Sequence, residues 1–195
     1  MMKRKYLTGE EVRSLLRTIS KDRVSYRDYC MVSMAFLHGL RVSELTGLKV
    51  TDYDPLSKII RIKRLKGGLS TNHPLLPEES VALGRWLAER ETLPGHQSPW
   101  LFLSRQGKRL SRQRFYQLLR EYGKQANLPL PIHPHMLRHA CGYNLAERGN
   151  DTRLIQDYLG HRNIRHTVIY TAANAERFNG AWMKGSDGSS NSPLV

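Results

Sequence analysis

Apolar residues recur three and four positions apart through most of this sequence, which is the spacing of one buried face of an α-helix. Thr8 and Glu11 form a capping-box pattern, Ser111 and Asp151 suit the N-cap position, and Gly160 suits a helix end. The predicted helices begin near residue 8 and cover residues 26–40, 78–91, 111–127, 134–149 and 151–160, with a short turn at 42–48 and a last helical region around 168–170.

One stretch departs from helical spacing. Residues 59–62 hold three isoleucines, which are typical of a strand. The glycine pair at 67–68 interrupts this strand, and residues 69–76 form the returning strand. We therefore expect a β-hairpin with Lys66 at its tip. Residues 101–103, Leu-Phe-Leu, are a second candidate for a short strand.

These elements predict a fold that is mainly α, with a small antiparallel β-sheet or hairpin. The sequence contains no internal repeat and no linker that would divide its body. We expect residues 1–184 to form a single domain, and the Ser/Gly-rich segment 185–195 to be a disordered tail.

The charge of the chain points to a polyanionic partner. Lys and Arg total 31 against 17 Asp and Glu, a formal net charge of +14. The basic residues are spread through the segments that look folded and are not confined to a tail, which favours nucleic acid binding. The alternatives are a ribosome-associated protein or a merely soluble basic protein.

Cysteine use and hydropathy bear on the compartment. Cys30 and Cys141 both lie in apolar helical patterns, so we expect buried, reduced thiols and no disulfide framework. No long apolar run or signal sequence is present, so the sequence predicts a cytoplasmic protein that in a bacterium would reach the nucleoid.

The densest group of chemically active side chains is the segment 133–139, His-Pro-His-Met-Leu-Arg-His. Pro134 suits the first turn of a helix, on which His135 and Arg138 share one face. That face could hold a phosphate, because Arg binds its oxygens bidentately and His moves protons. A zinc site at His135 and His139 is an alternative, but no carboxylate takes the metalloprotease position. Ordinary core and surface histidines are the third possibility.

Two further clusters are weak when each is taken alone. Gly160 would end a helix and project His161, and Tyr170 follows nine positions later, where a packed aromatic is the simplest interpretation. Arg41 and Glu44 are three residues apart, so that Glu44 could orient the guanidinium, or the two could form a common surface ion pair.

Taken together in their order, these segments resemble a known family. The matching segments are HGLRVSEL around Arg41, Lys66 on a hairpin, HMLRH, LGH, and VIYT around Tyr170. They are similar to the signature of the tyrosine recombinases, the phage integrase family, from about residue 7 to residue 177. Two longer segments resemble more narrowly the fimbrial phase-variation invertases, which flip a promoter segment. Their sequences are HPHMLRHACGYNLAERG and DTRLIQDYLGHRNIRHTVIYTA.

The resemblance implies the catalytic-domain fold of that family and a role for each matching residue. Tyr170 would attack the scissile phosphate and form a 3′-phosphotyrosine link. Arg41 and Arg138 would bind the non-bridging oxygens and stabilise the transition state. Lys66 would protonate the departing 5′ oxygen.

The remaining matching positions would assist. His135 would help proton transfer at Tyr170, and His161 would donate a hydrogen bond to the phosphate. Glu44 and His139 would support these residues from behind. Because a covalent link conserves the phosphodiester energy, the resemblance implies no cofactor and no metal, which fits a sequence without a Walker loop or a magnesium-binding carboxylate cluster.

The partners implied are double-stranded DNA with inverted repeat sites, a homotetramer on paired sites, and host DNA-bending proteins, with no membrane. Most members of the family have a helical DNA-clamping domain before the catalytic part. Arg41 comes too early to leave room for it here, as in the fimbrial invertases. Residues 172–183 could form a C-terminal helix that passes to a neighbouring subunit.

Two other functions remain open on the sequence alone. One is a DNA-binding regulator with the same fold and no catalysis, although every matching position holds a chemically competent residue. The other is a nicking-closing enzyme like a type IB topoisomerase, which would relax a plasmid without paired sites.

Overall fold

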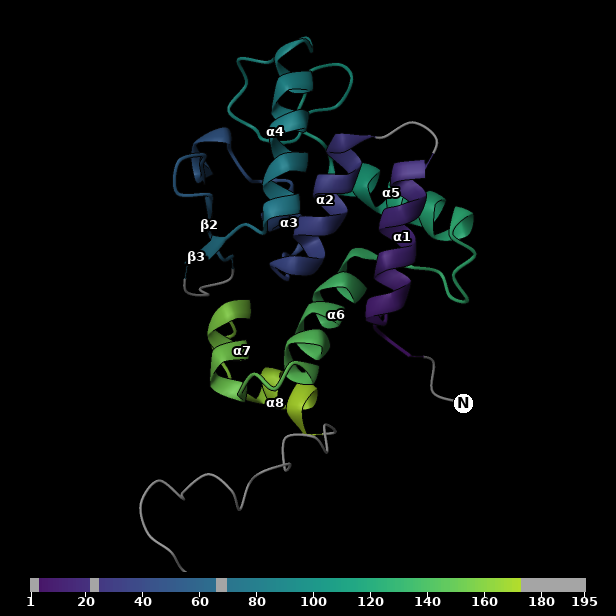
Figure 1. Cartoon of the computed structure of the whole chain (residues 1–195), viewed down its shortest axis with the longest axis vertical. Coiled ribbons are helices and arrows are strands. Elements are labelled where there is room, and N and C mark those ends of the chain that lie inside the picture. Colours follow the sequence, from purple (N-terminus) through teal and green to yellow (C-terminus); the bar gives the residue numbers. More distant parts are fainter. Residues whose placement is uncertain (1–3, 22–24, 66–69, 173–195) are drawn as a thin grey trace, which may run out of the picture.

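The computed structural model describes residues 4–21, 25–65 and 70–172. In chain order the elements are α1 (Gly9–Lys21), α2 (Tyr26–Leu37), α3 (Val42–Leu45), a 3₁₀ turn (Val50–Asp52), β1 (Tyr53–Asp54), β2 (Ile59–Ile62), β3 (Thr71–Pro74), α4 (Pro77–Glu91), α5 (Arg112–Gln125), α6 (Pro134–Glu147), α7 (Thr152–Leu159) and α8 (Arg165–Thr171). Figure 1 shows the helices surrounding α2, with the sheet at one side. The predicted tail at 185–195, and all but the first residue of the expected helix at 172–183, lie outside the described residues.

The predicted helix starts are confirmed by their hydrogen bonds. The N–H of Thr8 donates to Glu11 Oε2 at 2.8 Å, and the N–H of Glu11 donates to Thr8 Oγ1 at 3.2 Å. The side chains of Ser111 and Asp151 each accept backbone N–H groups from the first turns of α5 and α7. Gly160 ends α7 with a left-handed φ of +66°.

The helix α2 ends three residues before the predicted limit at residue 40. Gly39 has a φ of +56°, and the N–H of Leu40 donates to the carbonyl of Ala35, five residues earlier. This left-handed turn stops the helix and lets the chain restart at α3 with Arg41 as its N-cap. Helices α5 and α6 each end two residues before their predicted limits, at residues 125 and 147.

The sheet has three antiparallel strands in the order β1-β2-β3. The predicted pairing of β2 with β3 is confirmed, with Ile60 opposite His73 and Ile62 opposite Thr71. Lys66 and the glycine pair lie outside the described residues. The strand predicted at residues 101–103 is wrong: this segment forms isolated bridges only, and its three side chains are buried as a loop against the core.

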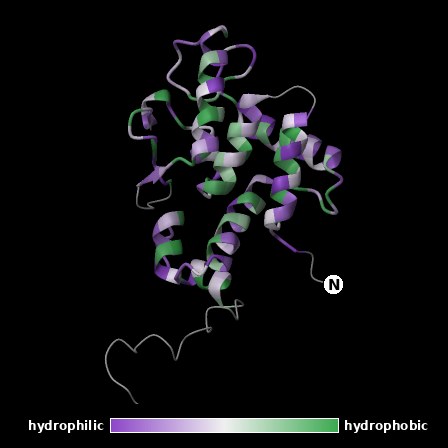
Figure 2. Cartoon of the chain, viewed as in Figure 1, coloured by the Kyte–Doolittle hydropathy of each residue, from purple (hydrophilic) through white to green (hydrophobic). Residues whose placement is uncertain are grey.

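The main core gathers around α2, which packs on α1, α4 and α6. Figure 2 shows α1 with hydrophobic and hydrophilic positions in turn, and Val12, Leu15 and Ile19 form its buried face. A smaller cluster at the junction of α6, α7 and α8 includes Cys141 and Tyr170. Both cysteines are buried and free, as predicted. No helix within the described ranges is long and apolar enough to span a membrane.

Candidate active site

The guanidinium of Arg138 joins three helices in the interior of the protein. Arg138 lies on α6 and is 1% exposed. One of its terminal nitrogens donates to the carbonyl of Gly39 after α2, and the other to the carbonyl of Leu159 at the end of α7, at 2.9 Å. Burial, followed by the charges of Arg41 and Arg64, lowers its pKa to about 10. The cation is therefore held by backbone dipoles and retains its charge at neutral pH.

Glu44 is a buried anchor for Arg41. The carboxylate accepts the backbone N–H of Arg41 at 2.9 Å and its Nη1 at 2.7 Å. The Glu44 side chain is 1% exposed and the Arg41 side chain 28% exposed. The alternative of a common surface ion pair is therefore wrong, because the carboxylate lies beneath the surface and holds a cation that reaches it.

Arg64 is a site neighbour that the sequence analysis missed. Its side chain is fully buried and donates to Glu44 at 3.1 Å. Its other terminal nitrogen donates to the carbonyls of His38 at 3.0 Å and Tyr158 at 2.6 Å. Nothing in the local sequence distinguishes this arginine from exposed ones, and arginine is rarely buried unless paired. One carboxylate thus serves two arginines, with a third cation, Arg138, beside them.

The electrostatic field of these arginines reaches the other predicted site residues. Burial, followed by the charges of Arg138 and Arg41, lowers the pKa of His161 to about 3. Burial and then the charge of Arg138 also lower the pKa of His135. The charges of Arg138 and Arg41 also act to lower the pKa of Tyr170, against the effect of its burial. The structure therefore gathers these five side chains at one place, where the surplus of positive charge suits an anion.

Tyr170 is held in a protonated resting state. It lies on α8 and is 3% exposed, and burial raises its pKa to about 12 against the opposing charge of Arg138. Its Oη lies 3.0 Å from Nδ1 of His139. Burial, followed by the charges of His135 and Arg138, lowers the pKa of His139 to about 4. A neutral His139 can therefore accept the hydrogen bond, and later the proton, of the Tyr170 hydroxyl.

The histidine in contact with the Tyr170 hydroxyl is His139, one helical turn beyond His135 on α6. The help with proton transfer that we predict for His135 stays a prediction. The rings of His135 and His139 meet edge to face, with centroids 4.4 Å apart. At Gly142, a further turn along, α6 passes so close to the Tyr170 ring that a Cβ there would lie 2.6–2.8 Å from three ring carbons. Within the described ranges, no group of three or more His, Cys, Asp or Glu could hold a metal ion.

His161 is oriented from the same helix that carries the tyrosine. Its Nδ1 lies 2.9 Å from Oγ1 of Thr167, which is fully buried and three residues before Tyr170 on α8. Thr167 is not among the residues predicted from the sequence, although it lies three positions before Tyr170, on the same side of a helix. Lys66, the last of the expected site residues, lies outside the described residues.

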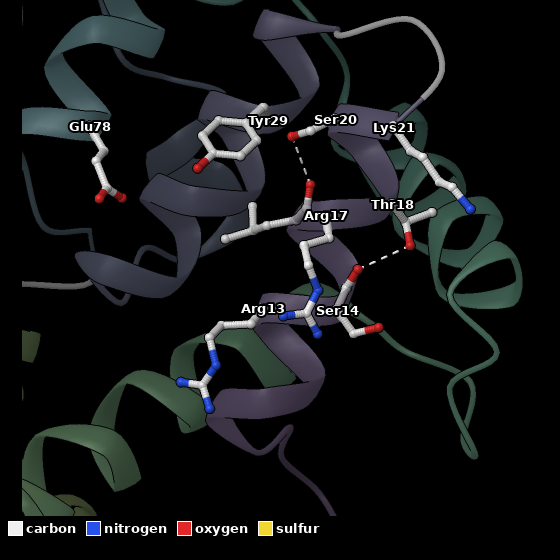
Figure 3. Close-up of a pocket in the computed structure, with 9 residues that line it drawn as sticks. Arg13, Ser14, Arg17, Thr18, Ser20, Lys21, Tyr29 and Glu78 are labelled. Carbon is white, nitrogen blue, oxygen red and sulfur yellow. Dashed lines mark hydrogen bonds between the residues drawn. The ribbon is translucent and has the colours of Figure 1, made fainter.

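One surface cavity adjoins the site, and another lies away from it. A cavity of about 470 Å³ adjoins His135 and is also lined by Arg112 and Tyr116 of α5. Another, of about 710 Å³, lies along α1 and is lined by Arg13 and Arg17 among others (Figure 3). The second contains none of the expected site residues, and both of these arginines are paired with a glutamate on their own helix.

Comparison with known proteins places the chain among DNA-processing enzymes. The phage integrase family matches residues 5–177. The chain is 54% identical over 180 residues to the type 1 fimbriae regulatory protein FimB of Escherichia coli K12, covering 92% of this chain and 90% of FimB. It is 53% identical over 183 residues to the type 1 fimbriae regulatory protein FimE of the same strain, covering 93% of this chain and 92% of FimE.

A solved structure gives the same picture of the fold. The crystal structure of the XerH site-specific recombinase bound to difH substrate, a pre-cleavage complex, aligns with a TM-score of 0.78 and 27% identity. The alignment covers 94% of this chain and 56% of the XerH chain, so this chain spans little more than half of that recombinase.

We expect Glu44→Gln to destabilise the protein by about 3 kcal/mol or more, because it leaves Arg64 buried without a counter-charge. Glu121→Gln is the matched control, since it breaks an exposed pair with Arg114 that contributes about 0–1 kcal/mol. Urea denaturation at neutral pH measures both. Equal losses for the two variants would contradict the role given to Glu44.

Glu44→Gln should also change how the free energy of unfolding depends on pH in the acid range. Burial alone would raise the pKa of Glu44, but the N–H of Arg41 and the charge of Arg64 outweigh it and hold the pKa below its usual value. Its stabilisation is therefore present above an unfolded-state pKa of about 4.3 and lost as the pH falls further. The stability difference between wild type and Glu44→Gln should narrow in acid.

We expect Gly142→Ala to lower the melting temperature, although alanine favours a helix over glycine by about 0.5–1 kcal/mol. A Cβ at Gly142 would lie 2.6–2.8 Å from three ring carbons of Tyr170, and such overpacking costs about 1–3 kcal/mol. Gly84→Ala on α4 is the control, because a Cβ there meets nothing within 4 Å, and it should raise the melting temperature. A stabilised Gly142→Ala protein would refute the close packing of Tyr170 on α6.

Proposed function

The chain belongs to the phage integrase family, and on that premise we propose that it cuts and rejoins DNA at specific sites through a covalent bond to Tyr170. The observation that carries the proposal is the Tyr170 hydroxyl, 3.0 Å from a neutral His139 and within the field of Arg41 and Arg138. A buried tyrosine hydroxyl needs a hydrogen-bond partner whatever its role, so the hydrogen bond alone does not mark a nucleophile. The combination of a neutral histidine at the hydroxyl with two arginine charges around it supports a nucleophile beside its base.

The cleavage step follows from this arrangement. Oη of Tyr170 attacks the phosphorus of the scissile phosphate, and its proton passes to Nδ1 of His139. The bond from phosphorus to the 5′ oxygen breaks, and Lys66 gives that oxygen a proton. The products are a 3′-phosphotyrosine and a free 5′ hydroxyl. Attack of a 5′ hydroxyl on the phosphotyrosine reverses the step and rejoins the strand.

The arginines supply the charge that the transition state needs. Arg41 and Arg138 bind the non-bridging oxygens, and His161 donates a hydrogen bond to one of them. Arg138 is fixed beforehand by the carbonyls of Gly39 and Leu159, so little reorganisation accompanies the reaction. Glu44 restrains Arg41 in the same way. Since the phosphotyrosine conserves the energy of the phosphodiester, we propose no cofactor and no metal.

The relatives favour a particular use of this chemistry. Two proteins more than half identical to the chain over most of their length are named fimbriae regulatory proteins. We propose that the chain inverts a promoter segment between inverted repeats and thereby switches fimbrial gene expression. Its substrate is double-stranded DNA, and the charge of +14 suits that partner.

The assembly and organisation that we propose follow the same family. Four copies act on two paired sites, with host proteins that bend the DNA, and the protein works at the nucleoid. Residues 1–184 act as one catalytic domain, a proposal supported by the main core that joins α1 through α6.

We expect Tyr170→Phe to abolish formation of a covalent protein–DNA adduct and all inversion, because the oxygen that would bond to phosphorus is removed. Folding and DNA binding should survive, since only a hydroxyl is removed. Tyr143→Phe is the matched control: its ring packs against Tyr170 with centroids 5.1 Å apart, and the loss of its hydroxyl should leave the adduct intact. The assay is a nicked suicide duplex resolved on a denaturing gel. An adduct formed by Tyr170→Phe would end the proposal.

A further inference from the structure

A chain of buried hydrogen bonds lies behind the arginine cluster, and the chemistry proposed above does not use it. His38 after α2, His73 on β3 and Glu79 on α4 are 1%, 2% and 3% exposed. Nε2 of His38 lies 2.9 Å from Oε1 of Glu79, and its Nδ1 lies 3.2 Å from Nδ1 of His73. Nε2 of His73 lies 2.8 Å from Oγ1 of Thr71.

The carboxylate of Glu79 gives these hydrogen bonds a direction when each histidine ring carries one proton. Both oxygens of Glu79 accept, one from His38 and the other from the N–H of Leu76 at 3.3 Å. Nε2 of His38 then donates, and with one proton on each ring Nδ1 of His38 accepts from Nδ1 of His73. Nε2 of His73 in turn accepts from the hydroxyl of Thr71. All the donors point the same way, toward Glu79.

The charge state of His73 agrees with this order. Burial lowers its pKa to about 3, and the charge of Arg64 acts in the same direction. The ring is therefore neutral near pH 7, with one nitrogen that donates and one that accepts. Its face packs on Tyr158, with ring centroids 4.1 Å apart.

The chain of hydrogen bonds ties β3 to the segment that carries the arginine site. The carbonyl of His38 accepts from Arg64 at 3.0 Å, and Gly39, the next residue, accepts from Arg138. Thr71 is the first residue of β3, so the hydrogen bonds hold the strand where it enters the sheet.

The other end of the β2–β3 connection is tied to the same segment. After β2 ends, Arg64 donates to Glu44, and the N–H of Leu65 donates to the same carboxylate at 3.2 Å. Both ends of the connection are thus fixed to residues 38–44. Lys66 belongs to this connection by its position in the sequence and lies outside the described residues.

A purely structural role would be served better by other side chains. Apolar residues of similar volume avoid the desolvation of three buried polar groups, and such replacements are often neutral or stabilising. Directional hydrogen bonds add orientation, which apolar packing does not. Orientation matters most for a strand that leads into a catalytic group.

We infer that the Glu79–His38–His73–Thr71 chain is a positioning device for the β2–β3 connection and, through it, for the proton that Lys66 gives to the departing 5′ oxygen. His38 and His73 are positioning residues and do not touch the DNA. The inference rests on the proposed function, because it needs Lys66 as the general acid.

The test compares two suicide duplexes that differ in one atom at the scissile phosphate. In one the bridging 5′ atom is oxygen, and in the other it is sulfur, which departs without a proton. We expect His73→Leu to slow cleavage of the oxygen duplex by about 10²-fold, as for a lost general acid, and to cleave the sulfur duplex at the wild-type rate. His73→Gln, which can both donate and accept, should recover part of the lost rate. His96→Leu, at an exposed histidine, is the control and should match wild type on both duplexes.

A folded His73→Leu protein with equal losses on both duplexes, or with no loss on either, would overturn the inference. If this variant does not fold, Thr71→Val gives the same comparison, since it removes only the last donor and keeps a β-branched residue. Nitrogen NMR of the wild-type histidines is a second check: His73 should carry its proton on Nδ1, and a proton on Nε2 would overturn the order of hydrogen bonds.

The proposed function is checked separately in the same assay. Wild type should form the adduct with both duplexes and Tyr170→Phe with neither. If Tyr170→Phe forms the adduct, the proposed function fails, whatever His73→Leu does. If only the oxygen-to-sulfur contrast of His73→Leu is missing, the positioning role fails and the proposed function stands.

Discussion

The structure around the site depends on one buried cation, Arg138, and the two backbone carbonyls that hold it. Those carbonyls belong to Gly39 after α2 and to Leu159 at the end of α7, so a single side chain of α6 sets the relative placement of three helices. Gly39 can present its carbonyl there because its left-handed conformation ends α2. The same contacts that stabilise this junction also fix the guanidinium that the proposed chemistry requires.

Burying positive charge is costly, and the site offsets that cost only in part. Arg41, Arg64 and Arg138 gather around the single carboxylate of Glu44, and backbone carbonyls accept from terminal nitrogens of Arg64 and Arg138, while Nε of Arg64 is buried with no hydrogen-bond partner among the described residues. The surplus of positive charge is unfavourable by itself, and it suits a phosphate anion. A protein under selection for stability alone would not keep this surplus. Functional sites commonly trade stability for activity in this way.

Tyr170, the proposed nucleophile, is buried and held by a hydrogen bond to His139. Burial keeps the Tyr170 hydroxyl protonated, and the same burial keeps His139 neutral and able to accept the proton. A phosphate between the arginines would cancel much of the surrounding charge and supply an electrophile at the same place. The resting protein is thereby prepared for the reaction without carrying a reactive phenolate.

The sequence by itself determined the helical architecture, the β2–β3 pairing and a family signature that includes Arg41, Arg138, His161 and Tyr170. Helix caps, helix-breaking residues and hydrophobic periodicity act over a few residues, so they can be recognised in the amino-acid sequence. Only the tertiary structure decided that His139 and not His135 meets Tyr170, that Arg64 shares the carboxylate of Glu44, and that residues 101–103 pack as a loop. Each of these depends on which distant segments meet, and burial of a polar side chain against a distant partner leaves no local pattern in the sequence.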